Sequence, residues 1–430
     1  MKIRTLSCGD ELHYYKKSLV LYFRGKRRVI STGLNHGGCR DDLQAVFNND
    51  GNPGPGMEFR LRAPTYREHL DVIAGQDLGL DPESCTGFCT AASMENVSIQ
   101  TMEQAYFTVT AIVTGGIEGN GARIGDSASY SEEPNRDTVE SDTVNPGTIN
   151  IILHIDADFP RGTLAKAMVS CAEAKVAALQ ELLAASRYSR GLATGSGTDG
   201  IIVVCNPESE HTLTDAGHHS LLGESIGKTV KAAVKEALYR QTGLSPRRQH
   251  DIIRRMDRFG VTSDTLWELY RSDIEQSHHQ LSGEQKSDQY PEKLSVSGGQ
   301  SDEQETGDIP RYEFENRLDQ LKTNEMLVTC TSLYAHLLDQ IDWGLLSPAE
   351  AWKAAEGVLE MAELKRAEGD GSEKMVPENL EQRRTESTET EQNGIGSTET
   401  ESEESAREVI ACMVRCYMKR LTARIVGQGE

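Results

Sequence analysis

The sequence has no apolar run that approaches the ~20 residues a helix needs to cross a membrane. Its N-terminal stretch, MKIRTLSCGDELHYYKK, also lacks the apolar core of a signal peptide. These two absences argue against membrane insertion and against export. We therefore expect the protein to stay in the cytoplasm.

Apolar residues and positive charges are both in short supply. Hydrophobic residues make up 37% of the 430 positions, which suffices for a core but is low for a chain folded throughout. We expect more than one domain and some disorder. Lys and Arg number 45 against 67 Asp and Glu, giving a formal net charge of -22. Because phosphate binding depends on Lys and Arg, this balance argues against a nucleic-acid partner and fits a soluble, salt-adapted protein.

The nine cysteines do not form a recognisable disulfide or zinc pattern. Their number is odd and they are scattered along the chain. Cys85 and Cys89 have the wrong spacing for a zinc knuckle and no second pair nearby. Cys412 and Cys416 lie one helical turn apart, which is typical of two buried thiols in a helix stripe. We expect reduced thiols.

Glycines and hydroxyl side chains gather in the stretch LATGSGTDGIIVVC, residues 192–205, where a small-residue loop runs into a short apolar strand. Glycine lacks a Cβ and accepts positive φ, so such a loop lets backbone N–H groups approach a ligand. Between the glycines stand side chains that can position a water, a nucleophile or a polar substrate group: Thr194, Ser196, Thr198 and Asp199. A flexible turn without function is the alternative.

The same loop satisfies the dinucleotide pattern G-x-G-x-x-G through Gly195, Gly197 and Gly200. That fingerprint needs a strand before it and a helix after it, because the helix N-terminus receives the pyrophosphate. Here the loop follows a helix and precedes a strand. We reject a dinucleotide site.

The first 243 residues predict an α+β domain, with a mixed β-sheet packed against long α-helices. A hairpin is expected from 19–23 and 28–34, and the stretch 48–56, NNDGNPGPG, is expected to be a loop. Hydrophobic periodicity predicts the remaining elements. They are strands near 87–92, 105–113, 148–155 and 201–205, helices over 67–76 and 163–188 with Thr163 as the cap, and a helix with an apolar stripe from Leu222 to Leu238 that stops at Thr242.

From residue 244 onward every segment with regular periodicity is helical, which predicts an all-helical C-terminal region of unknown role. The expected helices are 246–258, 263–272, 311–343, 347–367 and 406–425. Two polar segments, 283–307 and 368–404, are rich in Ser, Thr and Glu and too poor in apolar residues to fold. We expect them to be disordered acidic insertions.

Three metal-capable side chains follow the strand 148–155 at a spacing of two: His154, Asp156 and Asp158. Side chains two apart on a strand share a face, so these residues are candidates for a metal site. Alternating polar groups are also common on an exposed strand face, and that alternative stays open.

Two helices carry further candidates. Glu173 and Lys175 interrupt an Ala-rich helix and point in different directions, so one can face a cleft while ordinary solvated charges remain the alternative. His218 and His219 are expected in the first turn of the next helix, where the positive end of the dipole disfavours the imidazolium. A neutral imidazole is the form that a general base needs.

Residues 1 to about 243 resemble the adenosylcobinamide amidohydrolases of corrinoid salvage. Several separate stretches in one order carry the resemblance. They are 31–35 (STGLN), 37–38 (GG), 79–83 (GLDPE), 90–96 (TAASMEN), 125–126 (GD), 147–153 (GTINIIL), 173–175 (EAK), 193–200 (ATGSGTDG) and 217–220 (GHHS). His36, Ser196 and His218 depart from the residues usual in the family, which favours His219 over His218 as the catalytic histidine.

The resemblance implies hydrolysis of the amide between the corrin ring and the aminopropanol arm of adenosylcobinamide, giving adenosylcobyric acid. The cobalt then arrives inside the substrate and the protein requires no metal or cofactor of its own. Asp199 or His219 would act as general base on water or on the Thr198 hydroxyl. An open groove would bind the bulky corrinoid through polar residues: Asn35, Glu95, Asn96, Asp126, Asn150, Glu173, Lys175, Thr194 and Ser196.

Three alternatives remain open from the sequence. A helical interaction module after Ser245 would be able to accompany either of the other two. A carrier that binds the corrinoid without cleaving it would use the same groove. A metal-dependent amidase would use His154, Asp156 and Asp158. The sequence leaves the oligomeric state open, a homo-oligomer included.

Overall fold

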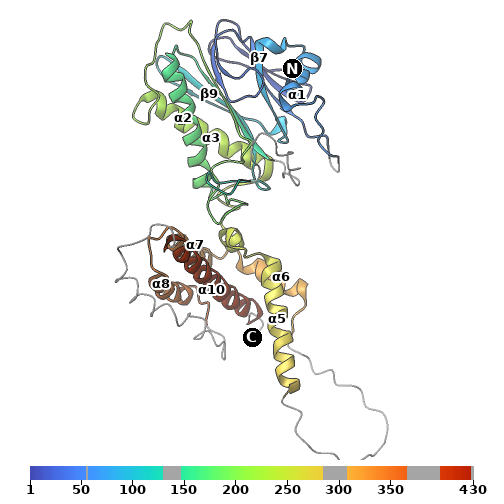
Figure 1. The fold of residues 1–430 in the computed structure, drawn as a ribbon, viewed down its shortest axis with the longest axis vertical. Helices are drawn as coiled ribbons and strands as arrows, with labels where there is room; N and C mark the ends of the chain where they lie inside the picture. The colour runs from blue at the N-terminus through green and yellow to red at the C-terminus, as the bar shows by residue number, and fades with distance from the viewer. Residues whose placement is uncertain (55–56, 129–146, 284–307, 366–397, 428–430) are drawn as a thin grey trace, which may run out of the picture. The chain divides into compact units, whose positions relative to one another are not determined.

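The computed structural model describes residues 1–54, 57–128, 147–283, 308–365 and 398–427. They divide into two compact units, Met1–Gln249 and His250–Glu430. Each unit is described by itself (Figure 1). The division lies a few residues beyond the boundary expected after residue 243.

Unit 1 contains two mixed β-sheets. The five-stranded sheet has the order β1 (Lys2–Thr5), β2 (Glu11–Tyr15), β3 (Ser18–Tyr22), β6 (Ala45–Asp50), β7 (Cys85–Thr90). The six-stranded sheet has the order β5 (Gly38–Arg40), β4 (Arg28–Ser31), β11 (Gly200–Cys205), β10 (Thr148–Ile155), β9 (Thr108–Gly116), β8 (Ser98–Glu103). β6 and β7 are parallel, as are β10 and β11, while the other neighbours are antiparallel.

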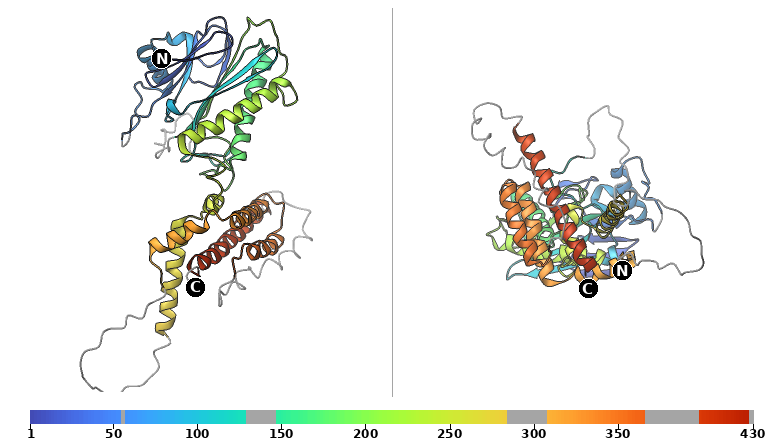
Figure 2. Two further views of the ribbon diagram at one scale, coloured as in Figure 1. Left: turned by 180° about the vertical axis from the view of Figure 1, so that it is seen from behind. Right: turned by 90° about the horizontal axis from the view of Figure 1, so that it is seen from below.

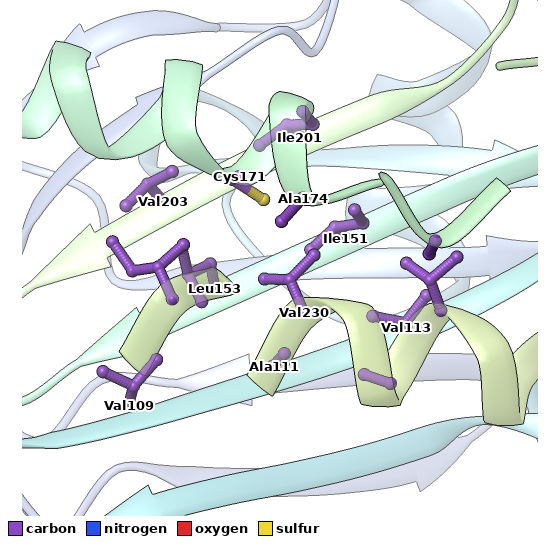
Figure 3. Close-up of a cluster of buried hydrophobic side chains, with 14 of the residues drawn as sticks. Val109, Ala111, Val113, Ile151, Leu153, Cys171, Ala174, Ile201, Val203 and Val230 are labelled. Carbon is purple, nitrogen blue, oxygen red and sulfur yellow. The ribbon is translucent and has the colours of Figure 1, made fainter. Parts of the chain in front are cut away.

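Helices cover the outer faces of the two sheets, so unit 1 has four layers. The long helices α2 (Arg161–Glu181) and α3 (Leu221–Thr242) pack on the six-stranded sheet, and α1 (Tyr66–Val72) packs on the five-stranded sheet (Figures 1 and 2). Figure 3 shows the core under the long helices, formed by Val109, Ala111, Val113, Ile151, Leu153, Ile201 and Val203 of the strands with Cys171, Ala174 and Val230 of the helices. The expected α+β class with a mixed sheet is confirmed.

Strand β10 shows how the sequence specifies these layers. Its odd-numbered residues from Ile149 to Ile155 face α2 and α3, whereas Ile152 faces the other sheet. Successive side chains of a strand point to opposite faces, so Asn150 and His154 also belong to the layer between the sheets. Both are buried. This strand forms over the residues that the sequence predicts.

Two sequence-based expectations near the N-terminus are wrong. β3 pairs with β2 and β6, while β4 pairs with β5 and β11, so residues 19–23 and 28–34 belong to different sheets and do not form a hairpin. Residues 48–50 are not a loop but the end of β6. Asn48 and Asn49 tolerate burial there because their amides donate to Thr114 Oγ1 and Ser18 Oγ, each at 2.8 Å.

The helix boundaries of unit 1 also differ from expectation. α2 begins at Arg161 after Pro160, and Thr163 is not its cap, because the Thr163 hydroxyl donates to Thr214 O at 2.9 Å. The helix ends at Glu181 instead of 188, since Leu183 adopts a positive φ of 50°. α1 is followed by a π-helical turn, Ile73–Asp77. Together the two elements cover the helix expected at 67–76.

Unit 2 is helical in its described part, as expected. Its helices, apart from one short 3-10 turn, are α4 (Ile252–Met256), α5 (Ser263–Gly283), α6 (Arg311–Leu321), α7 (Glu325–Asp342), α8 (Pro348–Met361) and α10 (Thr398–Val426). They share one apolar core that includes Leu338, Tyr334 and Tyr417. In the described part of the chain, no helix is both long and apolar enough to span a membrane.

Several boundaries in unit 2 depart from the expected ones. The helix expected at 311–343 is two helices, because Asn324 caps α7 by accepting from Leu327 N at 2.9 Å. α4 is far shorter than 246–258. α5 extends to Gly283 and α10 begins at Thr398, so the ends of the two segments expected to be disordered are helical. Residues 284–307 and 368–397 of those segments lie outside the described residues.

We expect residues 1–249 to fold without unit 2, because the three apolar cores of unit 1 draw no residue from beyond Leu244. A fragment ending at residue 243 should be less stable by about 1–3 kcal/mol. It loses Leu244 and the Gln249 amide, which donates to Leu182 O at 2.9 Å and Leu183 O at 3.0 Å. Urea unfolding of the two fragments, followed by circular dichroism, measures the difference. Equal midpoints, or a 1–249 fragment without a cooperative transition, would contradict this expectation.

Candidate active site

The carboxylate of Asp199, at the start of β11, is the centre of the glycine loop. Its Oδ1 accepts from Ser196 Oγ at 2.6 Å and from Ile149 N at 2.9 Å. Its Oδ2 accepts from Ser196 N at 3.2 Å and forms an ion pair with Lys175 of α2. Both charged side chains are about nine-tenths buried, with 10% and 11% exposure. Charge-assisted hydrogen bonds of this kind fix the loop against α2 and β10.

Two glycines allow this arrangement. A Cβ on Gly195 would lie 2.2 Å from Asp199 Oδ2 and 2.9 Å from Lys175 Nζ, so any side chain there would displace the ion pair. Gly197 has a φ of 81°, which L-residues rarely adopt. The glycines therefore let the backbone of the loop lie close to the ion pair of the protein itself.

A chain of hydroxyls leads from the surface to Asp199. Thr198 is exposed, and its Oγ1 lies 3.2 Å from Ser196 Oγ, which is buried and bonded to Asp199. Thr198 Oγ1 also donates to Gly147 O at 3.0 Å and contacts Thr148 Oγ1. The structure thus brings Asp199, Thr198, Ser196 and Lys175 together, as the sequence proposes for a shared site.

The turn after β4 lies beside this loop. Thr32 N donates to Ile201 O, and Thr32 Oγ1 accepts from Ile201 N, each at 3.0 Å. The fully buried Asn35 accepts from Gly87 N at 3.1 Å through its Oδ1. Its Nδ2 has no hydrogen-bond partner among the described residues. A buried amide donor without a partner is a candidate for contact with a ligand.

The side chain of Asn150 is buried and bonded to other parts of the protein. Its Oδ1 accepts from Gly200 N at 3.0 Å, and its Nδ2 donates to Asn48 Oδ1 at 2.9 Å. Asn48 in turn donates to Thr114. These contacts join the two sheets beneath the glycine loop. With its polar atoms engaged and its side chain buried, Asn150 supports the loop and does not line a surface.

A second loop, residues 122–126, lies against the glycine loop. Ala122 pairs with Gly195, and Thr194 Oγ1 accepts from Ile124 N at 2.9 Å. Asp126 closes the second loop by accepting from Arg123 N at 2.8 Å and Ser186 Oγ at 2.7 Å. Burial raises the pKa of Asp126, but hydrogen bonds from Ser189, Arg123 and Ser186 outweigh it and lower that pKa below its ordinary value. Thr194 and Asp126 therefore position the loop.

Glu95 and Asn96 follow β7 in a short 3-10 turn (Met94–Asn96). Asn96 Nδ2 donates to Gln241 Oε1 at 2.9 Å near the end of α3, and Glu95 is exposed. Gln241 packs against Gly116, the strand partner of Thr148. This turn is thus linked through Gln241 to the end of β9, which pairs with the start of β10 beside the Asp199 cluster.

The position of His219 relative to Asp199 follows from α2. After β11 the chain runs along this helix, where Ser170 Oγ donates to Ala216 O at 2.7 Å, while Lys175, further along the same helix, pairs with Asp199. Ser220, not a histidine, caps α3 by accepting from Gly223 N at 2.9 Å, so both histidines precede the first turn. His218 pairs with Glu173 at 3.1 Å, and both side chains are exposed. In the described part of the chain, no hydrogen bond or ion pair joins His219 to the Asp199 cluster.

The three residues proposed as metal ligands point to different partners. Asp156 accepts from Asn206 Nδ2 at 2.8 Å, and Asp158 pairs with Arg28 at 3.3 Å. They lie beyond the end of β10, so the alternation of the strand no longer aligns them with His154. Across residues 1–54, 57–128, 147–283, 308–365 and 398–427, the only group of three metal-capable side chains is Cys8, Asp10 and His154.

Sequence reasoning missed Asn48, Asp10 and Arg27. Asn48 lay in a stretch whose composition predicts a loop, and nothing in the sequence near Asp10 or Arg27 indicates burial. The spacing of two between Asn150, Ile152 and His154 was the one available signal for polar groups between the sheets.

Comparisons with known proteins agree with the extent of unit 1. The family model described as adenosylcobinamide amidohydrolase matches residues 4–246. An uncharacterized protein of Methanocaldococcus jannaschii is 32% identical over 232 residues, which cover 52% of this chain and 87% of that protein. The adenosylcobinamide amidohydrolase of Methanosarcina mazei is 27% identical over 235 residues, which cover 53% of this chain and 98% of that protein.

Proposed function

The chain belongs to the adenosylcobinamide amidohydrolase family, and from this we propose that unit 1 hydrolyses the amide between the corrin ring and the aminopropanol arm of adenosylcobinamide. The products are adenosylcobyric acid and the free amine. The observation that carries the proposal is that residues from several of the stretches shared with the family come together around Asp199. Lys175, Ser196 and Thr198 meet there, next to the starts of β10 and β11.

Amide hydrolysis needs a nucleophile, a proton acceptor and donors for the oxyanion. Thr198 is the exposed end of the hydroxyl chain, so its hydroxyl, or a water that it holds, is placed to attack the carbonyl. The proton passes through Ser196 to Asp199, whose Oδ1 lies 2.6 Å from the Ser196 hydroxyl. Base assistance of this type is typically worth about 10²- to 10⁴-fold.

Asp199 and Lys175 also act as positioning residues. Each oxygen of Asp199 accepts two hydrogen bonds, so the carboxylate holds the loop before any proton arrives. When the carboxylate takes up a proton, the Lys175 ammonium loses its counter-charge and becomes available to the developing oxyanion. In this proposal the chemistry comes from the side chains of the protein, and the cobalt belongs to the substrate.

Two exposed apolar side chains flank the site. Leu34 lies in the turn beside Asn35 and is 65% exposed, and Ile124 lies in the loop held by Thr194 and is 88% exposed. Apolar groups in such positions suit the broad face of a corrin ring, while the Asn35 amide offers a donor to a peripheral amide. The corrinoid is thus proposed to lie across these loops.

A product assay tests the proposal. The purified full chain is incubated with adenosylcobinamide, and the products are separated and weighed by mass spectrometry. We expect a corrinoid acid together with one equivalent of aminopropanol, with undiminished yield in the presence of a chelator. Binding without cleavage would support the carrier function instead. Loss of activity in chelator, restored by added metal, would support the metal-dependent amidase. Parallel reactions with unadenosylated cobinamide show whether cleavage requires the adenosyl group of the substrate.

A further inference from the structure

The hydroxyl of Thr148 lies in the candidate active site, but the function proposed above gives it no role. Thr148 is the first residue of β10, and its side chain is buried. Its Oγ1 lies 3.2 Å from Thr198 O and also contacts Thr198 Oγ1. Among the residues that the structure describes, these two oxygens are the only hydrogen-bond partners of the Thr148 hydroxyl. The Thr148 hydroxyl therefore acts on Thr198.

The proton of each hydroxyl can be assigned from the groups that only accept. A hydroxyl carries one proton and two lone pairs. Because a carboxylate has no proton to give, the Ser196 hydroxyl donates to Asp199 Oδ1 at 2.6 Å. Ser196 Oγ can then only accept from Thr198 Oγ1, which lies 3.2 Å away. In the proposed reaction Thr198 gives its proton to Ser196, so the contact between Thr148 and Thr198 Oγ1 is left with the proton of Thr148.

The carbonyl of Gly147 competes with Ser196 for the Thr198 proton. Thr198 Oγ1 donates to Gly147 O at 3.0 Å, slightly closer than Ser196 Oγ. Gly147 O also accepts from Nδ2 of the buried Asn120 at 2.6 Å, so it stays hydrogen-bonded when the Thr198 proton turns away. A carbonyl left without a donor would oppose that turn. The competition is therefore decided by what else holds Thr198 Oγ1, and that group is Thr148.

Thr148 is a rigid donor. Its backbone is paired with Gly116 of β9, and a β-branched side chain has a restricted χ1. When Thr148 donates to Thr198 Oγ1, it occupies a lone pair there and leaves the Thr198 proton directed at another acceptor. The bond also strengthens as negative charge develops on Thr198 Oγ1, since hydrogen bonds to charged oxygens are stronger than those to neutral ones. A donor fixed in the sheet needs no reorganisation at that moment.

We infer that Thr148 is a positioning residue of the proposed amide hydrolysis, which donates to Thr198 Oγ1 and directs the Thr198 proton toward Ser196. The inference rests on the function proposed above. The protons balance, because Thr198 Oγ1 loses one to Ser196 Oγ and Ser196 passes its own to Asp199 Oδ1. The electron pair left on Thr198 Oγ1 forms the bond to the carbonyl carbon, or takes a proton from a water that forms that bond, and the carbonyl π electrons move to oxygen.

Steady-state kinetics of the full chain with adenosylcobinamide tests the inference through three variants. Thr148→Val and Thr148→Ala remove the hydroxyl with and without a methyl group in its place, whereas Thr148→Ser keeps it. We expect the first two to lower kcat by at least about ten-fold with KM within about two-fold, because Thr148 contacts Thr198 and not the substrate. Thr148→Ser should stay within about three-fold of the wild type. A kcat of Thr148→Ala equal to that of the wild type, or a serine variant as impaired as the alanine variant, would overturn the inference.

Thr110 provides a matched control in the same sheet. It is buried in β9, and its Oγ1 lies 3.1 Å from Thr101 Oγ1 of β8, so Thr110→Val also removes a hydroxyl from a threonine pair. Its strand partner is His154, near the other end of β10 from Thr148. Thr110→Val should leave kcat within about two-fold of the wild type. A loss as large as that of Thr148→Val would show a general effect of removing hydroxyls from the sheet and contradict the inference.

Crystal structures of the wild type and the Thr148 variants separate this inference from the proposed function. Wild-type protein that releases no product would refute the proposed function, whereas the position of the Thr198 side chain tests the inference without activity. Thr198 Oγ1 should stay within about 3.5 Å of Ser196 Oγ in the wild type and in Thr148→Ser. It should adopt another χ1 rotamer in Thr148→Val and Thr148→Ala, where its donor is missing. An unchanged Thr198 rotamer in Thr148→Ala would contradict the inference whatever the activity of that variant.

Discussion

Replacing Asp199 with asparagine is expected to lower kcat/KM for adenosylcobinamide by about 10³-fold. Asparagine keeps the shape of the side chain but removes the charge that pairs with Lys175. Its amide nitrogen must also face a donor, because the two Asp199 oxygens together accept from Ile149 N, Ser196 and Lys175. The variant therefore loses both the proton acceptor and the geometry of the glycine loop. Steady-state kinetics with product detection by mass spectrometry measures the loss.

Glu181, near the end of the helix that carries Lys175, provides a matched control variant. Glu181 of α2 pairs with Lys231 and Lys235 of α3, so Glu181→Gln also breaks carboxylate–lysine pairs, but outside the site. It should leave kcat/KM within about two-fold, since exposed pairs contribute little. His219→Asn should cost less than Asp199→Asn, because Asp199 holds the glycine loop through hydrogen bonds from Ile149, Ser196 and Lys175, and in the described part of the chain His219 is not bonded to this cluster. An Asp199→Asn enzyme that keeps half its activity while folded would refute the proposed site.

Removing the Asp10 carboxylate is expected to destabilise unit 1 by about 3–5 kcal/mol. Asp10→Ala leaves Arg27 and His154 buried, with their shared counter-charge gone. Urea unfolding of the 1–249 fragment at pH 7 gives the free energy. Glu224→Ala, which breaks an exposed pair with Lys228 four residues along α3, should change the free energy by less than about 0.5 kcal/mol. Equal effects of the two substitutions would show that the buried cluster contributes no more than a surface pair.

The same cluster predicts a pH dependence of stability. The folded pKa of His154, about 9, lies above its ordinary value of 6.5, so its contribution is complete below pH 6.5 and is lost as the pH rises through about 9. The folded pKa of Asp10, about 2, lies below 3.8, so its contribution is present above pH 3.8 and is lost as the pH falls through about 2. Between pH 6.5 and 9 the wild type should lose stability relative to Asp10→Ala. Parallel curves over this range would contradict the assignment.

The local pattern of residues predicted a large part of the fold. The alternation in TINIILHI gives β10, and the apolar stripe from Leu222 to Leu238 gives α3. Helical periodicity in every regular segment after residue 244 indicates the helical character of unit 2. These features depend on neighbours within a few residues, where backbone periodicity and side-chain polarity act directly. The boundaries were less accurate, because caps such as Asn324 and the positive φ of Leu183 depend on local contacts.

Contacts between residues that are distant in the chain could not be predicted from the sequence pattern. β3 and β4 are close in sequence, yet they belong to different sheets because each finds its partner elsewhere, β6 for one and β11 for the other. Asn48 was expected in a loop because polar residues are costly to bury, and only the approach of Thr114 and Asn150 satisfies its amide. A polar side chain can be buried only where another group hydrogen-bonds to it, and the sequence does not show which residue provides that bond.

The sequence by itself determined that glycines, hydroxyls and Asp199 share one loop, because these residues are contiguous and small side chains dictate a close backbone. Only the tertiary structure decided that Lys175 faces Asp199 and that His218 pairs with Glu173 instead. It alone also joined Asp10 to His154, which is 144 residues away. The physical reason is that charge and hydrogen bonding act over a few ångströms in space, and folding of the whole unit sets those distances.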